Sequence, residues 1–89
     1  MTNNEVAQAF ARGETHGKAN SMFIESAGNG RVIYSYGYHF PIALIKDGAC
    51  FFNTDKYSRT TSKHQTEVRR AIYGVVLHGV DTVNLQAMI

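Results

Sequence analysis

Residues of the types that carry out catalysis are present, but their spacing matches no known catalytic arrangement. Ser58, His64 and Asp55 could be combined on paper into a nucleophile, a base and a supporting carboxylate. Such a set is recognised by its geometry in space, and three common residues in one polar segment do not specify that geometry. The chain also lacks a nucleophile elbow, a Walker loop and a dinucleotide-binding glycine pattern. We therefore expect no catalytic residue and a protein that is not an enzyme.

Metal-ligating residue types are equally sparse. His39, His64 and Cys50 could each donate to a metal ion, but none of them belongs to a paired spacing such as CxxC or HxxxH. Cys50 stands in an aromatic segment, where a small buried core residue is the usual role. The sequence therefore predicts neither a metal site nor a cofactor.

The strongest asymmetry in the chain is electrostatic. Residues 56–70 contain five cations and one acid, which gives a net charge of +4, whereas the rest of the chain has four cations and six acids and carries −2. The five cations are Lys56, Arg59, Lys63, Arg69 and Arg70. The same segment contains Tyr57, Thr60, Thr61 and Ser62. Because a helix start adds partial positive charge and free backbone amides, the segment can form a site for phosphate or another anion. A capped helix with a solvated basic side is the alternative.

Tyrosines form the second asymmetry. Tyr34, Tyr36 and Tyr38 lie close together around Gly37. Tyrosine and arginine are enriched in protein interfaces, so we expect these three tyrosines to form an interface with a second copy of the chain or with another protein. Stacking on unpaired bases and simple packing in the core of a small domain are the alternatives.

Turn residues and alternating hydrophobicity predict a small sheet. Strands are expected at residues 19–26, 31–36, 38–45 and 49–53, joined by tight turns that include Asn29-Gly30 and Asp47-Gly48. In the third strand, Ile42 and Leu44 are expected to share one face. Pro41 has no backbone N–H group, so this strand is expected to be an edge strand or to be distorted there.

Two helices are expected to flank the sheet. Asn3 or Asn4 can cap the first helix, and Gly13 has the position of a left-handed C-terminal cap. The second helix is expected to begin with a capping box at residues 62–65, and apolar residues at helical spacing carry it to Gly79.

Together these elements predict an α+β fold: a four-stranded antiparallel meander with two helices packed on one face, in the order α-β-β-β-β-α. Residues 1–89 form one small domain in this prediction. Residues 80–89 fit either a final turn capped by Asp81 or an extension of the sheet. The other sheet face must then meet water, a second copy or a ligand. A chain this short buries only about 60–65% of its unfolded surface, so dimerisation is a natural supplement.

The composition restricts where such a domain acts. A chain with 44% hydrophobic and 18% charged residues is typical of globular proteins, so disorder along its full length is not expected. No run approaches the ~18 apolar residues of a membrane-spanning helix. The first residues lack the basic and apolar parts of a secretory signal. The single cysteine cannot form an internal disulfide, which fits a reducing compartment. We expect a cytoplasmic protein without a membrane partner.

Two stretches resemble a known group of sequences. Residues 32–37 with Ile42-Ala43 form the first, and residues 53–65 form the second. They resemble small uncharacterised phage, prophage and metagenomic proteins with a domain of unknown function and a YSYG…IA…KYSxTTxxHQ pattern. The resemblance implies a viral or mobile-element origin and transfers no catalytic residue. By size and origin it also implies similarity to anti-defence factors such as anti-CRISPR proteins.

These observations lead to one expected function and one alternative. We expect a small phage-type protein that docks on nucleic acid or on a host nucleoprotein complex through its basic loop and helix start. It would act in the cytoplasm of the host cell. The alternative is a homo-oligomeric protein–protein interaction module that uses a tyrosine-rich sheet face.

Overall fold

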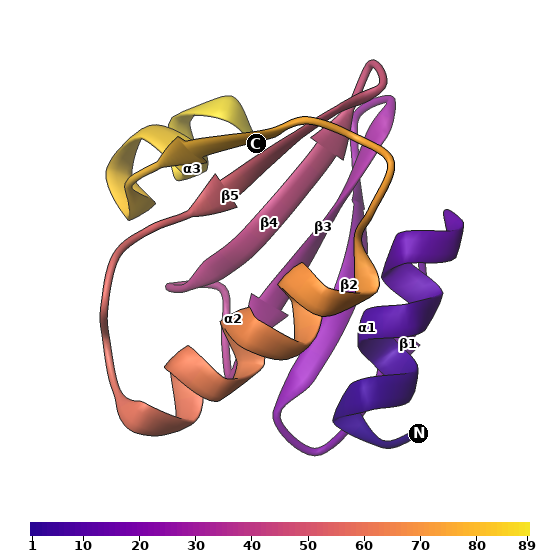
Figure 1. The fold of residues 1–89 in the computed structure, drawn as a ribbon, viewed down its shortest axis with the longest axis vertical. Helices are drawn as coiled ribbons and strands as arrows, with labels where there is room; N and C mark the ends of the chain where they lie inside the picture. The colour runs from indigo at the N-terminus through magenta and orange to yellow at the C-terminus, as the bar shows by residue number, and fades with distance from the viewer.

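A six-stranded mixed sheet forms the centre of the fold, with strands in the order β1-β2-β3-β4-β5-β6. The computed structural model describes residues 1–89. The strands are β1 (Gly17–Lys18), β2 (Met22–Ala27), β3 (Gly30–Ser35), β4 (Pro41–Lys46), β5 (Ala49–Asn53) and β6 (Leu77–Val80). The helices are α1 (Asn3–Arg12), α2 (Arg59–Ala71) and α3 (Thr82–Met88). Figure 1 shows α1 and α2 side by side on one face of the sheet.

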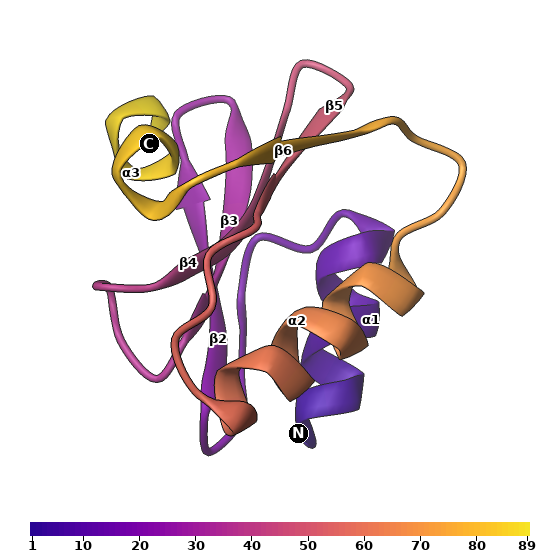
Figure 2. The same ribbon diagram turned by 60° about the vertical axis from the view of Figure 1, so that its left-hand side comes forward.

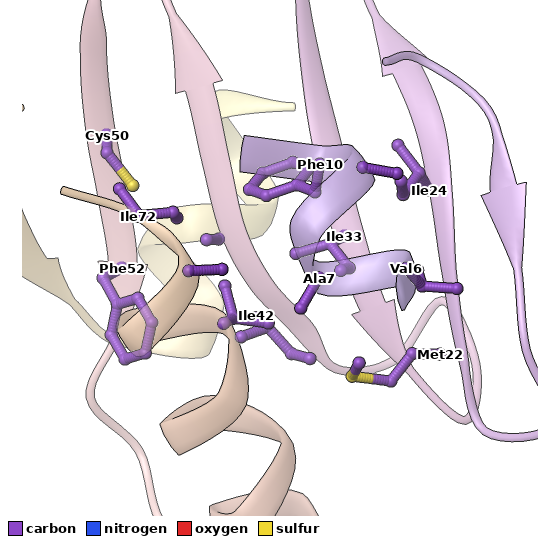
Figure 3. Packing of buried hydrophobic residues seen from close by; sticks show 14 of the residues in the cluster. Val6, Ala7, Phe10, Met22, Ile24, Ile33, Ile42, Cys50, Phe52 and Ile72 are labelled. Carbon is purple, nitrogen blue, oxygen red and sulfur yellow. The ribbon is translucent and has the colours of Figure 1, made fainter. Parts of the chain in front are cut away.

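The helices divide the two faces of the sheet between them, which makes three layers (Figure 2). Figure 3 shows the larger core, where side chains such as Phe10 and Ile33 meet between the sheet and the helices α1 and α2. A smaller core lies on the opposite face and consists of Val32, Tyr34, Leu44 and Leu85. Leu85 belongs to α3, so this helix covers part of the sheet face that was expected to meet water, a second copy or a ligand.

The α+β class is confirmed, and the predicted antiparallel meander is present as β2 to β5. The fold is larger than predicted, however. The short strand β1 adds to one edge of the meander, and β6 pairs in parallel with β5 at the other edge. Of the two alternatives for residues 80–89, the cap is the one observed: Asp81 caps α3, and residues 82–88 are helical and do not extend the sheet. None of the helices has the length and apolar character needed to cross a membrane.

The second helix begins earlier and ends earlier than predicted. Ser58 is the N-cap, because its Oγ accepts the Thr61 N–H at 3.1 Å. The helix ends at Ala71 and does not reach Gly79. Gly74 follows with φ +82°, and glycine in a helix costs about 1 kcal/mol relative to alanine. The residues after it pair with β5 instead, so the parallel strand replaces the last turns of the predicted helix.

The first helix also begins one residue before the predicted caps. Thr2 is its N-cap and forms a capping box with Glu5: the Glu5 N–H donates to Thr2 Oγ1 at 3.1 Å, and the Thr2 N–H donates to Glu5 Oε1 at 2.7 Å. Gly13 forms the predicted C-cap, with φ +107°.

Strand β4 is central in the sheet although it begins at Pro41. Of the two predicted outcomes, distortion is the one observed, because the β3–β4 register shifts between Ile33 and Tyr34. Such a β-bulge changes which side chains share a face. Ile42 therefore contributes to the larger core and Leu44 to the smaller one, and the prediction of a shared face was wrong.

The chain between β3 and β4 forms a tight loop where the third strand was expected to begin. The Ser35 N–H donates to the Phe40 carbonyl at 3.0 Å, and the Tyr36 N–H donates to the Ser21 carbonyl at 2.8 Å. Tyr36 has φ +65°, a left-handed conformation that is unusual for a bulky residue. The loop separates Tyr36 from Tyr34, which was expected to lie on the same strand face.

Candidate nucleic-acid interface

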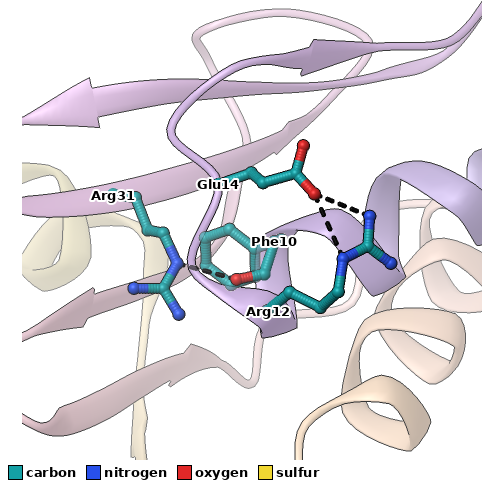
Figure 4. A network of polar contacts seen from close by, with 4 residues as sticks. All are labelled: Phe10, Arg12, Glu14 and Arg31. Atoms are coloured by element: carbon teal, nitrogen blue, oxygen red, sulfur yellow. Dashed lines mark hydrogen bonds and ion pairs between the residues drawn. The ribbon is translucent and has the colours of Figure 1, made fainter.

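All five cations of the basic segment are exposed and none of them is part of an ion pair. Figure 4 shows two arginines outside this segment, Arg12 and Arg31, that interact with other groups of the same chain. Arg12 pairs with Glu14 at 2.6 Å, which is the one ion pair of the chain. Arg31 donates to the Phe10 carbonyl at 2.7 Å and lies over the Phe10 ring, and burial lowers the pKa of Arg31. The basic segment therefore keeps its positive charge available.

The cations follow the outer side of α2. At about 100° of rotation per residue, Arg59, Lys63 and Arg70 fall within one narrow strip. From Arg59 to Arg70 the strip is about 16 Å long, given a rise of about 1.5 Å per residue. Arg69 lies beside the strip, and Glu67, the one acid of the segment, lies on its other flank. The outer side of α2 is thus a linear array of positive charge.

The hydroxyl groups of the segment differ in accessibility. Thr60 is exposed and Ser62 is half-buried, so both can reach an external partner. Thr61 is buried, and its Oγ1 accepts a hydrogen bond from Ser58 Oγ at 3.1 Å. Thr61 therefore stabilises the helix start and is not available as a binding residue.

Tyr57 lies beside Lys56 in the loop before α2. The Tyr57 side chain is 64% exposed, and its ring packs on the rings of His39 and Phe40, with centroid distances of 5.7 Å. A base or another planar group can stack on the free side of such a ring. Tyr57 therefore extends the basic surface beyond the end of the helix.

The other three tyrosines do not form one surface. Tyr34 is only 6% exposed and stacks on Phe23 with a centroid distance of 5.1 Å. Tyr36 and Tyr38 are 57% and 62% exposed, and both line an open groove of about 830 Å³ beside β2. The Tyr38 hydroxyl donates to Glu25 at 2.7 Å, which raises the pKa of Tyr38. Tyr34 therefore belongs to the core, and only Tyr36 and Tyr38 can contact a partner.

His64 lies on the inner side of α2, where it connects both long helices to the sheet. Its Nδ1 atom is 2.7 Å from Ser35 Oγ on β3. Its Nε2 atom is 3.3 Å from Asn3 Nδ2 on α1 and 3.4 Å from Ser21 Oγ. The Tyr36 ring packs against the imidazole with a centroid distance of 5.4 Å. Burial lowers the pKa of His64, so the ring is neutral at neutral pH.

The pair of Ser35 and His64 is not arranged for nucleophilic catalysis. With the Asn3 amide donating to Nε2, the neutral ring carries its proton on Nδ1 and donates to Ser35 Oγ. A catalytic base has to accept the serine proton instead. Both side chains are also buried, so no substrate reaches them. Of the set considered from the sequence, Ser58 is occupied as the cap of α2.

A second polar network connects the start of the basic segment to α3. Asn53 Nδ2 donates to the Pro41 carbonyl at 2.8 Å and to Thr82 Oγ1 at 2.9 Å. Gln65 Nε2 donates to the carbonyls of Asn53 and Asp55, at 2.8 and 3.0 Å. The Asp55 carboxylate accepts the Thr82 N–H at 2.9 Å, which lowers its pKa. These contacts fix the loop from which the basic helix begins.

The stretch of residues 53–65 therefore contains residues that stabilise the fold, a role that was not predicted for them from the sequence. Those that are buried or that cap the helix are Asn53, Ser58, Thr61, His64 and Gln65. One indication was present: Thr61, His64 and Gln65 occur at i, i+3 and i+4, the spacing of the buried side of a helix. Because the three side chains are polar, this spacing did not predict their burial. Polar side chains are buried only when the fold supplies hydrogen-bond partners for them.

The side chains considered as metal ligands do not assemble. No group of three or more His, Cys, Asp or Glu side chains is placed to hold a metal ion. Cys50 is part of the larger core, where burial raises the pKa of its thiol to about 11. A thiol of this kind is neither a reactive nucleophile nor a ready ligand at neutral pH.

Comparison with known proteins places the chain in a family without a described activity. No curated protein and no solved structure matches it. Residues 5–74 match a family described as a family of unknown function, DUF8033. The match covers most of α1, the whole meander and α2, and it ends before β6 and α3. Because it includes well over half of the residues, the chain belongs to the DUF8033 family of unknown function.

Proposed function

We propose that this protein binds the phosphate backbone of nucleic acid, free or within a host nucleoprotein complex, through the outer side of α2 and the loop before it. The observation that carries the proposal is the array of five exposed cations without an ion-pair partner. Phosphate contacts give affinity and position without sequence readout. A protein of phage or prophage origin that occupies such a complex would act as an inhibitor of host defence, as anti-CRISPR proteins do.

Helix stability does not account for all of these cations. Arg69 and Arg70 lie in the last turn of α2, where positive charge favours the helix. Arg59 is the first helical residue, however, and the first turn contains no acid. A cation at a helix start is unfavourable by about 0.3–1 kcal/mol. By contrast, α1 has Glu5 in its first turn. A binding role explains why α2 carries Arg59 at its start at a cost in stability.

The test combines charge reversal with a matched control. The Arg59→Glu/Lys63→Glu variant should lose measurable binding to duplex and single-stranded oligonucleotides in fluorescence anisotropy. Lys18→Glu/Lys46→Glu makes the same change in net charge away from α2, and this control should retain most of the binding. Wild-type affinity should fall steeply as salt concentration rises, because binding releases counterions from the nucleic acid. Equal losses in both variants, or no loss in the first, would refute the proposed site.

A pull-down from host lysate distinguishes free nucleic acid from a nucleoprotein complex as the partner. If nuclease treatment removes every captured protein, the protein binds nucleic acid and captures others through it. If the Arg59→Glu/Lys63→Glu variant loses a captured complex that survives nuclease treatment, the target is a nucleoprotein whose acidic or phosphate groups remain protected.

The second candidate function is a homo-oligomeric interaction module. Its supporting observation is that Tyr36 and Tyr38 both line the groove beside β2, where two exposed aromatic rings offer contact area to another protein. In this case light scattering of the wild type should give a mass above that of one chain, with little dependence on salt. Tyr38→Ala should reduce that mass. A monomer at all concentrations would refute the module.

A further inference from the structure

A small pocket lies between α2 and the chain that leaves β5. Its volume is about 200 Å³. Its lining includes Phe52, Thr54, Lys56, Ser62, Thr66 and Arg69. This lining contains two cations, three hydroxyl groups and no carboxylate. It also brings together Lys56 and Arg69, which lie at opposite ends of the basic segment in the sequence.

Three donor side chains of this pocket, Lys56, Ser62 and Arg69, are free, whereas the hydroxyls of Thr54 and Thr66 donate to backbone carbonyls. The Arg69 guanidinium lies over the Phe52 ring at 5.2 Å from its centre, so packing restricts the side chain while its N–H groups remain unpaired. Ser62 is half-buried, and its hydroxyl forms no hydrogen bond within the chain. Lys56 is exposed and has no partner in the molecule. Pre-oriented donors lose less conformational entropy on binding than mobile ones.

The size and charge of the pocket select one kind of ligand. Pockets that hold drug-sized molecules are typically about 300–1,000 Å³, so this one is too small to enclose a nucleoside. A phosphate monoester carries about −1.5 to −2 charges at neutral pH and offers three acceptor oxygens. An internal diester of a nucleic acid strand carries a single charge. The planar fork of an arginine suits a phosphate group, and a lysine adds a point charge.

We propose that this pocket binds a single phosphate monoester, held by Lys56, Arg69 and Ser62. The inference rests on the proposed function and deepens it: the ligand is the terminal phosphate of a nucleic acid strand whose backbone follows the cations of α2. A phosphorylated small molecule offers the same chemistry, and the experiment includes it as a separate arm.

The test compares oligonucleotides that differ only in a 5′ or 3′ terminal phosphate, in fluorescence anisotropy at constant salt. Wild-type protein should bind one phosphorylated form about tenfold more tightly than the unphosphorylated strand, as expected for charge-assisted hydrogen bonds to one added group. Lys56→Gln and Arg69→Gln should each remove most of this preference. Lys63→Gln and Arg70→Gln are matched controls outside the pocket, and they should weaken both strands equally. Lys56→Gln alters an exposed loop residue that forms no hydrogen bond or ion pair within the chain, so this variant should fold as the wild type does.

A nucleoside monophosphate as competitor forms the second arm. If it displaces the phosphorylated strand from wild type but not from Lys56→Gln, the pocket recognises the phosphate group itself. If oligonucleotides bind with salt dependence but without any preference for a terminal phosphate, the pocket proposal is wrong and the proposed function stands. If no oligonucleotide binds while the monophosphate binds and requires Lys56, the proposed function is wrong and the pocket stands.

Discussion

The two sides of α2 differ in how their polar groups are satisfied. On the inner side, every buried polar side-chain atom has a hydrogen-bond partner, and His64 and Gln65 connect the helix to α1, the sheet and the loop before it. On the outer side, Arg59, Lys63 and Arg70 have no partner within the chain. Within the KYSxTTxxHQ pattern, Thr61, His64 and Gln65 belong to the inner side and support the fold, whereas Lys56, Tyr57 and Thr60 are exposed. A partner is therefore to be sought through the exposed residues.

The largest effect on stability is expected at the centre of the inner side. His64→Ala removes a buried ring together with its hydrogen bonds to the Ser35 hydroxyl and the Asn3 amide. The free energy of unfolding should fall by about 3 kcal/mol, from the cavity and the lost hydrogen bonds together. Urea denaturation measures this change. The neighbouring substitution Lys63→Ala, on the outer side, should stay within about 0.5 kcal/mol of wild type. If both variants lost a similar free energy of unfolding, the inner side of α2 would not be more important for stability than the outer side.

The next largest effect is expected at Asn53, which supports the loop before α2. Asn53→Ala leaves the Pro41 carbonyl and the Thr82 hydroxyl without their donor, and the free energy of unfolding should fall by about 2 kcal/mol. Thermal unfolding followed by circular dichroism measures the shift. Lys56→Ala changes the same loop at an exposed position and should leave the melting temperature almost unchanged.

Acidification should weaken the inner side through His64. Burial holds its folded-state pKa below the ordinary value of 6.5, so the unfolded chain binds a proton more readily than the folded chain. The contribution of neutral His64 is present above pH 6.5 and is lost as the pH falls from there through the folded-state pKa. Denaturation curves from pH 7.5 to 5 should show this decline in wild type and a flatter profile in His64→Gln. Identical profiles would show that His64 is not responsible.

The smallest effect on the fold is expected from single changes on the outer side. Arg70→Ala should leave the unfolding transition where it is, yet it should reduce the slope of log affinity against log salt by about 0.9 for duplex DNA. Anisotropy titrations at several salt concentrations give this slope. An unchanged slope would show that Arg70 does not neutralise a phosphate.

The sequence predicted the local elements better than their assembly. Turn residues such as Asp47-Gly48 and the alternating strands gave the meander, because the chemistry that sets a hairpin is local. Strand β6 was missed because its pairing with β5 is decided by tertiary contacts, and residues 75–80 read equally well as the end of an apolar helix. Long-range pairing of this kind leaves no periodic signature in a short segment.

The candidate site was likewise predicted only in part, because some of its features are local and others depend on tertiary contacts. Exposure of Lys56, Arg59 and Lys63 follows from their charge, since cations are rarely buried without a partner. Which of the hydroxyls and tyrosines remain exposed could not be read from spacing. Thr61 is buried by the position of the N-cap, and Tyr34 is buried in the smaller core that Leu85 of α3 completes. The pocket of Lys56 and Arg69 depends on how α2 lies against β5, which only the assembled fold determines.

The parallel pairing of β6 has a consequence for how the chain matures. The meander can assemble from neighbouring hairpins, whereas β6 can pair only after α2 has crossed back over the sheet. During synthesis on the ribosome, β5 is therefore an unpaired edge for a time. The apolar side chains of Val32 and Leu44 stay exposed until Leu85 packs on them. Free edges and uncovered apolar faces promote aggregation of nascent chains. Pairing of β6 and packing of α3 thus end the period in which the newly made sheet is most vulnerable to misassembly.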